Sequence, residues 1–176
     1  MSRLLRGENI DFYLAMSLDG ISVLNDLAGG VTVTLEDDFS AADPAMTKGA
    51  TLTLQGDQAE IFVRRRMDIG EGTNEARMVR QEEYLAQLSA QLESRVQQDQ
   101  QFTAQVYDAL QPYLVTDLAK GQLVNEVWAA KDDTVEPAIA LEGEHKVAED
   151  GFTEFYPTEA SIQKAVLTLF WEPVEE

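Results

Sequence analysis

The spacing of apolar and polar residues predicts alternating strands and helices in the first third of the chain. Residues 12–17 form an apolar run of strand length, and residues 31–35 (VTVTL) and 51–54 (TLTL) alternate as half-buried strands do. Residues 21–28 carry apolar side chains at i, i+3 and i+7, which is typical of one helix face, and the stretch 57–63 predicts a short helix. The order strand, helix, strand favours an α/β layer over a helical bundle.

From Thr73 onward, helical spacing dominates. A long amphipathic helix is predicted from Thr73 to about Gln97, with an apolar face made by Met78, Leu85, Leu88 and Leu92. Further helices are predicted over 102–110, over 120–130 and after Thr158, with a strand over 138–147. Because the sequence shows neither an internal repeat nor a linker, we interpret 1–176 as a single domain.

Composition and charge narrow the function classes. The chain of 176 residues has 32 acidic and 13 basic residues, a formal net charge of −19, which excludes a generic nucleic-acid binder and gives no support to DNA regulation. It contains no cysteine, so disulfides, thiolate metal sites and cysteine nucleophiles are excluded. No apolar stretch approaches the roughly 18 residues of a membrane helix, and we find no signal-peptide pattern.

Basic residues are concentrated in one segment of this acidic chain. Five arginines, Arg64, Arg65, Arg66, Arg77 and Arg80, lie within 17 positions and flank the sequence Gly70-Glu71-Gly72. Arginine binds phosphate through two parallel hydrogen bonds, glycine permits close approach of the backbone, and a helix N-terminus favours anions. Arg77 and Gln81 share one helix face that continues into Tyr84 and Leu88. The segment therefore predicts a phosphate or pyrophosphate site beside the core.

The alternative is that these arginines only form ion pairs with the many carboxylates and contribute little. Other candidates are weaker. His145 fits a surface histidine, and the acidic runs at 36–38 and 132–133 match no calcium loop and fit solvated loops.

Ordered segments of the chain resemble the LytR-CpsA-Psr domain, a family of cell-envelope proteins. They are IDFY at 10–13, DG at 19–20, LNDLAGGVTV at 24–33, LQGDQA at 54–59, FVRRR at 62–66 and ARMVRQ at 76–81. The resemblance is strongest over 4–95, and 96–176 is similar only to the variable C-terminal part. It implies an α/β fold in which a central mixed β-sheet is flanked by helices, with an apolar pocket between sheet and helices.

The same resemblance implies a phosphotransferase that moves a glycopolymer, such as teichoic acid or capsular polysaccharide, from polyprenyl pyrophosphate to peptidoglycan. Its motifs imply that Arg64, Arg66, Arg77, Arg80 and Gln81 bind the pyrophosphate, with Arg77 and Gln81 as catalytic residues. Asn74 stands where the family motif usually has aspartate, and it could still cap the helix and orient Arg77.

The family resemblance also implies Mg²⁺, with its ligands in a preceding part of the domain, so no metal ligand is assigned within this chain. We interpret 1–176 as a partial domain whose full-length protein is extracytoplasmic and anchored in the membrane by a preceding segment. Whether the chain alone is an enzyme stays open. The alternatives are a non-catalytic module that binds polyprenyl phosphate or another polyanion, and a structural partner whose arginines only form ion pairs.

Overall fold

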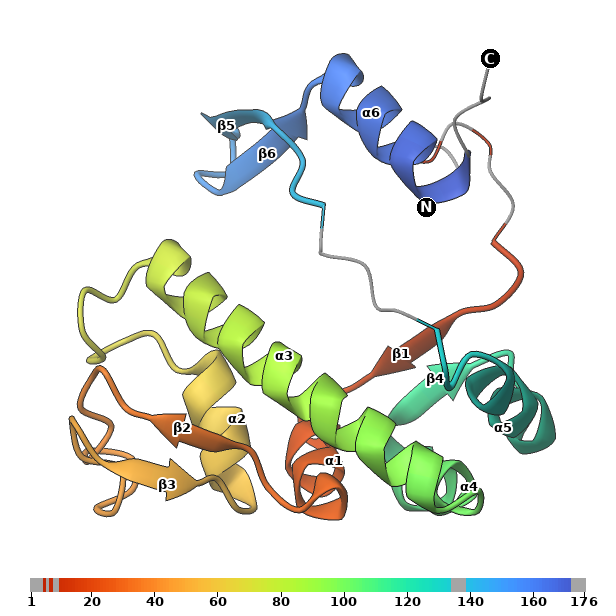
Figure 1. The fold of residues 1–176 in the computed structure, drawn as a ribbon. Helices are drawn as coiled ribbons and strands as arrows, with labels where there is room; N and C mark the ends of the chain where they lie inside the picture. The colour runs from red at the N-terminus through yellow and green to blue at the C-terminus, as the bar shows by residue number, and fades with distance from the viewer. Residues whose placement is uncertain (1–4, 6, 8–9, 134–138, 172–176) are drawn as a thin grey trace. The chain divides into compact units, whose positions relative to one another are not determined.

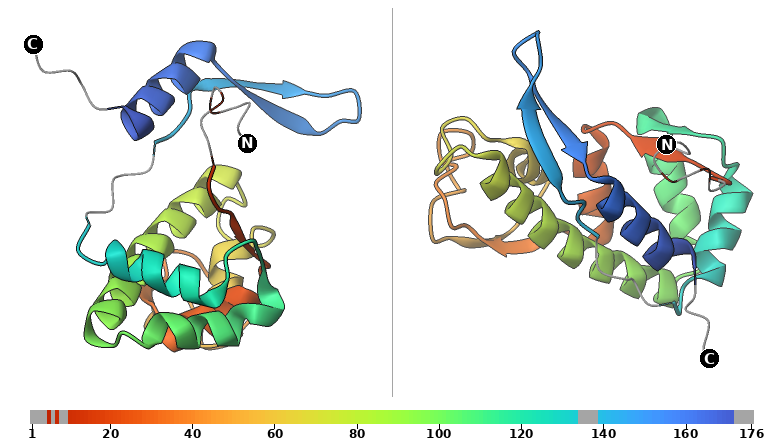
Figure 2. Two further views of the ribbon diagram at one scale, coloured as in Figure 1. Left: turned by 90° about the vertical axis from the view of Figure 1, so that its right-hand side faces the viewer. Right: turned by 90° about the horizontal axis from the view of Figure 1, so that it is seen from above.

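The computed structural model describes residues 5, 7, 10–133 and 139–171. Contacts within it group into two compact units (Figures 1 and 2). The main unit is Phe12–Asp133, and the terminal unit combines Met1–Asp11 with Thr134–Glu176. Both contain helices and antiparallel strands, so the predicted α/β class is confirmed.

The main unit holds most of the secondary structure. Its elements are β1 (Leu14–Met16), α1 (Gly20–Ala28), β2 (Thr32–Thr34), β3 (Thr51–Thr53), α2 (Asp57–Arg64), α3 (Asn74–Gln98), α4 (Phe102–Leu110), a 3-10 turn (Gln111–Tyr113), β4 (Leu114–Thr116) and α5 (Lys120–Ala129). β1 pairs antiparallel with β4, and β2 pairs antiparallel with β3. The helices α1, α2 and α3 contact one another pairwise, with α3 as the long green helix of Figure 1.

The terminal unit contains a β-hairpin followed by a helix. β5 (Gly143–Val147) pairs antiparallel with β6 (Thr153–Pro157), and α6 spans Glu159–Phe170. The Thr158 hydroxyl accepts a hydrogen bond from the Ser161 N–H at 3.2 Å, so the predicted cap of the last helix is confirmed. The predicted strand over 138–147 is shorter than expected, and its first residue, Ala138, lies outside the described residues.

The strands of the described residues form three two-stranded antiparallel sheets. The continuous central sheet implied by the resemblance is therefore distributed here over three pairs. β4 and β6 were not predicted: β4 directly follows a 3-10 turn, and β6 lies in a stretch without strict alternation. The β1–β4 pair joins residues about a hundred positions apart, such as Leu14 and Thr116, which local periodicity does not reveal.

The core of the main unit lies between α1, α2, α3 and the β2–β3 hairpin. The alternating residues Val31, Val33 and Leu35 are almost fully buried, as their spacing predicts. Asn25 of α1 is buried among them. Its Nδ2 donates to the Leu54 carbonyl at 2.8 Å, and its Oδ1 accepts from the Val31 N–H at 3.1 Å. One amide thus joins α1 to the residue before β2 and the residue after β3, which satisfies buried polar groups that would otherwise be costly.

The buried stripe of α3 differs from the predicted one. Leu88 is buried as expected, but Met78 and Leu85 are 54% and 57% exposed. The stripe runs instead through Arg80, Tyr84 and Leu88. Arg80, a charged residue, therefore lies on the buried face of α3, whereas the predicted apolar face would have turned it toward solvent.

Candidate functional site

Two helices and their connection build the arginine-rich segment. Helix α2 has Asp57 and Glu60 in its first turn and Arg64 in its last, a charge order that complements the helix dipole. The Arg64 guanidinium lies 2.6 Å from Glu60 Oε1, and its side chain is 59% exposed. Because an exposed i, i+4 pair contributes little, Arg64 retains the capacity to bind an anion.

Four of the five arginines line a cavity of about 460 Å³, here called the arginine cavity. Its lining is Glu60, Ile61, Arg64, Arg65, Arg66, Met67 and Arg77. The structure thus brings together Arg64, Arg66 and Arg77 from the predicted site. Arg65 also lines the cavity but was not predicted as a site residue, although its place in the FVRRR run was an available signal.

Asn74 connects two of these arginines. Its Oδ1 accepts hydrogen bonds from Arg66 Nη1 at 3.2 Å and from Arg77 Nη2 at 3.1 Å. The predicted orienting role toward Arg77 is therefore confirmed, and it extends to Arg66. The capping role belongs to Thr73, whose hydroxyl accepts from the Ala76 N–H at 3.1 Å. Because the amide of Asn74 is neutral, it fixes both guanidinium groups without cancelling their charge.

The Arg77 side chain also has a hydrogen-bond donor available for a ligand. Among the described residues, its Nε is buried and has no hydrogen-bond partner. A buried donor of this kind usually finds a partner, so an anionic acceptor beside Arg77 would satisfy it.

A second cavity of about 460 Å³, here called the apolar cavity, adjoins the first. It is lined by Met16, Leu18, Ile21, Leu24, Val63, Tyr84, Leu85 and Leu88, together with Arg64, Arg77 and Gln81. Arg64 and Arg77 therefore line both cavities. The two spaces offer an apolar compartment and a cationic compartment that meet at the same two guanidinium groups.

Gln81 and Tyr84 anchor the wall of the apolar cavity. Gln81 Nε2 donates to the Val63 carbonyl at 2.9 Å, and the Tyr84 hydroxyl donates to Asn25 Oδ1 at 3.2 Å. Burial, followed by the negative charge of Asp26, raises the pKa of Tyr84 to about 12. Tyr84 is therefore a neutral hydrogen-bond donor at physiological pH.

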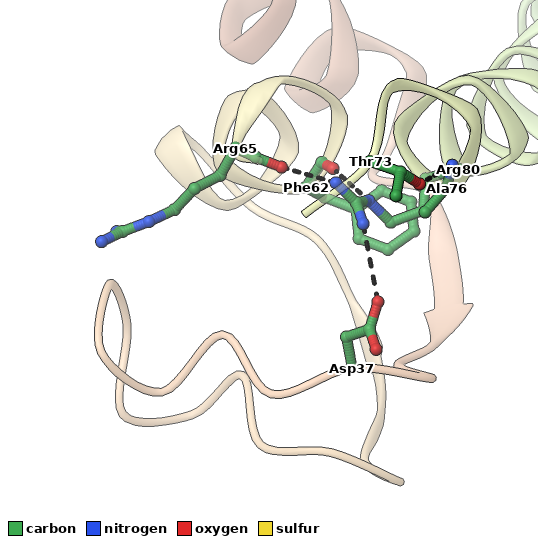
Figure 3. A network of polar contacts seen from close by, with 6 residues as sticks. All are labelled: Asp37, Phe62, Arg65, Thr73, Ala76 and Arg80. Carbon is green, nitrogen blue, oxygen red and sulfur yellow. Dashed lines mark hydrogen bonds and ion pairs between the residues drawn. The ribbon is translucent and has the colours of Figure 1, made fainter. Parts of the chain in front are cut away.

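Arg80, the fifth arginine, lines neither cavity, and Figure 3 shows the contacts of its guanidinium group. It is 9% exposed, and its Nε and Nη2 donate to the carbonyls of Phe62 and Arg65 at 3.2 and 2.5 Å. Its Nη1 lies 3.6 Å from Asp37 Oδ2. Desolvation lowers the pKa of Arg80, Asp37 raises it, and Arg77 lowers it further. The structure does not bring Arg80 together with the other predicted anion-binding residues.

Gly70 and Gly72, between the two arginine groups, do not lie where a ligand-binding role would place them. Gly70 and Gly72 have φ values of 48° and 65°, but neither lines the arginine cavity. A Cβ added to Gly70 would lie 2.4 to 2.6 Å from the Asp37 carboxylate. Gly70 is therefore required for the close approach of Asp37, the ion-pair partner of Arg80, whereas we expected it to approach a ligand.

The weaker candidates from the sequence, His145 and the two acidic runs, make contacts with neighbouring protein side chains and backbone. The His145 ring lies 5.0 Å from the Phe155 ring on the β-hairpin of the terminal unit. In the acidic run 36–38, Asp37 pairs with Arg80 and Asp38 accepts from the Ser40 N–H at 3.0 Å. Asp132 pairs with Lys131.

In the part of the chain that the structure describes, no group of three or more histidine, aspartate or glutamate side chains is placed to hold a metal ion. None of the helices in the described ranges is long and apolar enough to cross a bilayer.

Comparison with known families identifies the class of protein. The model of the LytR_cpsA_psr family matches residues 4–169, so the chain belongs to that family. The resemblance seen in the motifs is thereby confirmed, and the match extends well beyond residue 95. No curated protein matches the chain.

Solved structures share the fold. A Streptococcus agalactiae protein superposes with a TM-score of 0.74 at 21% identity, over 95% of this chain and 59% of that one. TagV of B. subtilis gives 0.65 at 18% identity, over 98% and 68%. TagT bound to LI-WTA gives 0.68 at 18% identity, over 96% and 62%.

The chain spans 59% to 71% of the length of these and the other most similar solved chains. At these identities the likeness shows the fold. The matched family is one of cell-wall glycopolymer transferases.

Proposed function

We propose that this chain binds the pyrophosphate and the lipid of a polyprenyl-pyrophosphate-linked glycan, as part of an enzyme that transfers the glycopolymer to peptidoglycan. The observation that carries the proposal is the meeting of the arginine cavity and the apolar cavity at Arg64 and Arg77. An amphiphile with an anionic head and an apolar tail matches both compartments at once. Teichoic acid and capsular polysaccharide are the candidate polymers.

In this proposal Arg64, Arg66 and Arg77 hold the pyrophosphate oxygens, with Arg65 at the rim. A sugar hydroxyl of peptidoglycan attacks the phosphorus nearest the glycan. The new P–O bond forms while the bond to the bridging oxygen breaks, polyprenyl phosphate leaves with the electron pair, and the hydroxyl proton passes to solvent. The guanidinium groups stabilise the charge that develops on the phosphoryl oxygens.

Gln81 is proposed to act beside Arg77, because its side chain lines the apolar cavity at the boundary with the arginines. Its amide nitrogen already donates to the Val63 carbonyl, which fixes the side chain relative to α2. Arg80 is assigned a different part, described below.

We likewise propose Mg²⁺ as the metal ion of the full-length enzyme, and no step is assigned to it here. We further propose an extracytoplasmic location, with membrane anchoring in the full-length protein.

The test is a calorimetric titration of the chain with geranylgeranyl pyrophosphate, with and without Mg²⁺. Arg77→Ala should weaken binding about 10- to 100-fold, because it removes a charge-assisted contact worth about 1.5–3 kcal/mol. Arg95→Ala is the matched control, since it removes the same charge from an exposed position further along α3. An Arg77→Ala variant with wild-type affinity would contradict the proposal.

A transfer assay with a polyprenyl-pyrophosphate-linked glycan and peptidoglycan separates the two candidate functions. Transfer that Arg77→Ala abolishes supports the enzyme. Metal-independent binding without transfer favours the non-catalytic binding module, and absence of binding favours a structural partner whose arginines form only ion pairs.

A further inference from the structure

We propose that Arg80 is a positioning residue, which holds the C-terminal carbonyls of α2 and thereby fixes Arg64 and Arg66 at the arginine cavity. The proposal rests on the function proposed above, and it reassigns Arg80 from a ligand contact to a support for other ligand contacts. It is carried by the contacts that Arg80 makes and by its burial away from both cavities.

The first step concerns the end of α2. A helix leaves its last carbonyls without intrahelical partners, and those groups need donors when they are buried. Arg80 Nε donates to the Phe62 carbonyl at 3.2 Å, and Nη2 donates to the Arg65 carbonyl at 2.5 Å. These two carbonyls lie on either side of Arg64 in the sequence. Arg80 therefore holds the backbone on both sides of Arg64, while Gln81 of the same helix holds the intervening Val63 carbonyl.

The second step concerns the choice of residue. The guanidinium group offers several donors in one rigid plane, so it reaches two carbonyls and still directs Nη1 toward Asp37 at 3.6 Å. A lysine in its place would donate all of its hydrogen bonds from one nitrogen atom. The positive charge also lies at the C-terminal end of a helix, where the dipole favours a cation.

The third step concerns the closed environment of the guanidinium. Arg80 lies over the Phe39 ring, 5.3 Å from its centroid, and Asp37 is held close by the absence of a side chain at Gly70. Arg80 is 9% exposed, whereas Arg64 is largely exposed beside the cavity. A bound pyrophosphate would therefore meet Arg64, Arg66 and Arg77, and Arg80 would act through the first two.

The experiment is a double-mutant cycle in the full chain, read by calorimetric titration with geranylgeranyl pyrophosphate. Arg80→Lys keeps the charge but provides one ammonium for two carbonyls. We expect it to weaken binding about tenfold in the wild-type background, the size of coupling found between residues of one network. In the Arg64→Ala/Arg66→Ala background, the same substitution should change affinity less than about twofold.

If Arg80→Lys weakened binding by the same factor in both backgrounds, the proposal would be overturned. Such independence would mean that Arg80 contacts the ligand itself. Leu110→Ala is the control for stability. It removes a buried side chain of α4, away from α2, and should lower the melting temperature without changing affinity. Should Leu110→Ala weaken binding as much as Arg80→Lys does, Arg80 would have only a general structural role.

Hydrogen exchange of the unliganded chain tests the same support without a ligand. In Arg80→Lys, the amide of Arg65, which donates to the Ile61 carbonyl at 3.0 Å, should exchange at least tenfold faster than in the wild type, while those of α4 stay unchanged. Unchanged exchange at Arg65 overturns the proposal. If the wild-type chain binds no geranylgeranyl pyrophosphate but this amide responds, the proposed function fails while the support of α2 by Arg80 stands.

Discussion

The arginine cavity and the apolar cavity have the same volume, about 460 Å³, and opposite chemistry. The first is formed by the end of α2, the residues after it, and Arg77. The second needs α1, α2 and α3 together. Arg64 and Arg77 line both cavities and so mark the boundary between a cationic compartment and an apolar one, which in the proposed function would receive the head and the tail of the ligand. Substitutions on either side of that boundary should therefore have separable effects.

The largest effect is expected on the apolar side, from the ionisation of Tyr84. Its folded-state pKa of about 12 lies above the usual value of 10, so the folded state favours the neutral phenol. This contribution is fully present below pH 10 and is lost as the pH rises through 12. Two pKa units correspond to about 2–3 kcal/mol in the free energy of unfolding.

Tyr84→Phe should remove that pH dependence, measured as the difference between variant and wild-type urea denaturation from pH 9 to 12. At neutral pH the variant should be about 1 kcal/mol less stable, because the hydrogen bond from Tyr84 to Asn25 is lost. Parallel curves for the two proteins up to pH 12 would contradict the buried, neutral tyrosine.

A smaller effect tests the assignment of the tail. Leu85 lines the apolar cavity but is 57% exposed, so Leu85→Gln should leave the fold intact. We expect about fivefold weaker binding of geranylgeranyl pyrophosphate, from the loss of about 1 kcal/mol of apolar contact. Binding of inorganic pyrophosphate should not change.

Val79→Gln is the control for Leu85→Gln, since Val79 is exposed on the same helix and lines neither cavity. Equal losses for both pyrophosphate probes in Leu85→Gln would show that the boundary between head and tail is misplaced.

The smallest effect concerns the arginine side. Asn74→Asp would place a carboxylate between Arg66 and Arg77, whose guanidinium groups now share one neutral oxygen. We expect about threefold weaker pyrophosphate binding at low salt, and a smaller difference at high salt because of screening. Ser94→Asp, which adds the same charge to an exposed part of α3, should have no effect. Tighter binding by Asn74→Asp would mean that fixing the arginines matters more than their charge.

Local patterns predicted much of this fold, for identifiable reasons. Residues 31–35 alternate strictly, and the structure buries Val31, Val33 and Leu35 as expected. The helix over 21–28 ends as predicted, because Gly29 adopts the left-handed conformation with φ of 103°. The pairing of β1 with β4 was not predictable, since it depends on contacts between distant residues.

The sequence predicted which residue types form the site, but only part of how those residues are arranged. The density of arginines between positions 64 and 80 located the arginine cavity. It did not distinguish Arg77 from Arg80, which lie three positions apart on one helix. That difference depends on the carbonyls at the end of α2 and on Asp37, and neither leaves a periodic signal in the sequence. Asn74 was expected to orient Arg77, and the structure adds Arg66 to its partners.

The bonds that organise the arginine cavity join residues close in sequence. Those from Arg66 and Arg80 span 8, 15 and 18 positions, whereas the Tyr84–Asn25 bond beside the apolar cavity spans 59. Loop-closure entropy grows with the logarithm of loop length, so the longer closure costs about 1 kcal/mol more. During folding, we therefore expect the arginine cavity, whose lining lies within residues 60–77, to form before the apolar cavity, which also needs residues 16–24.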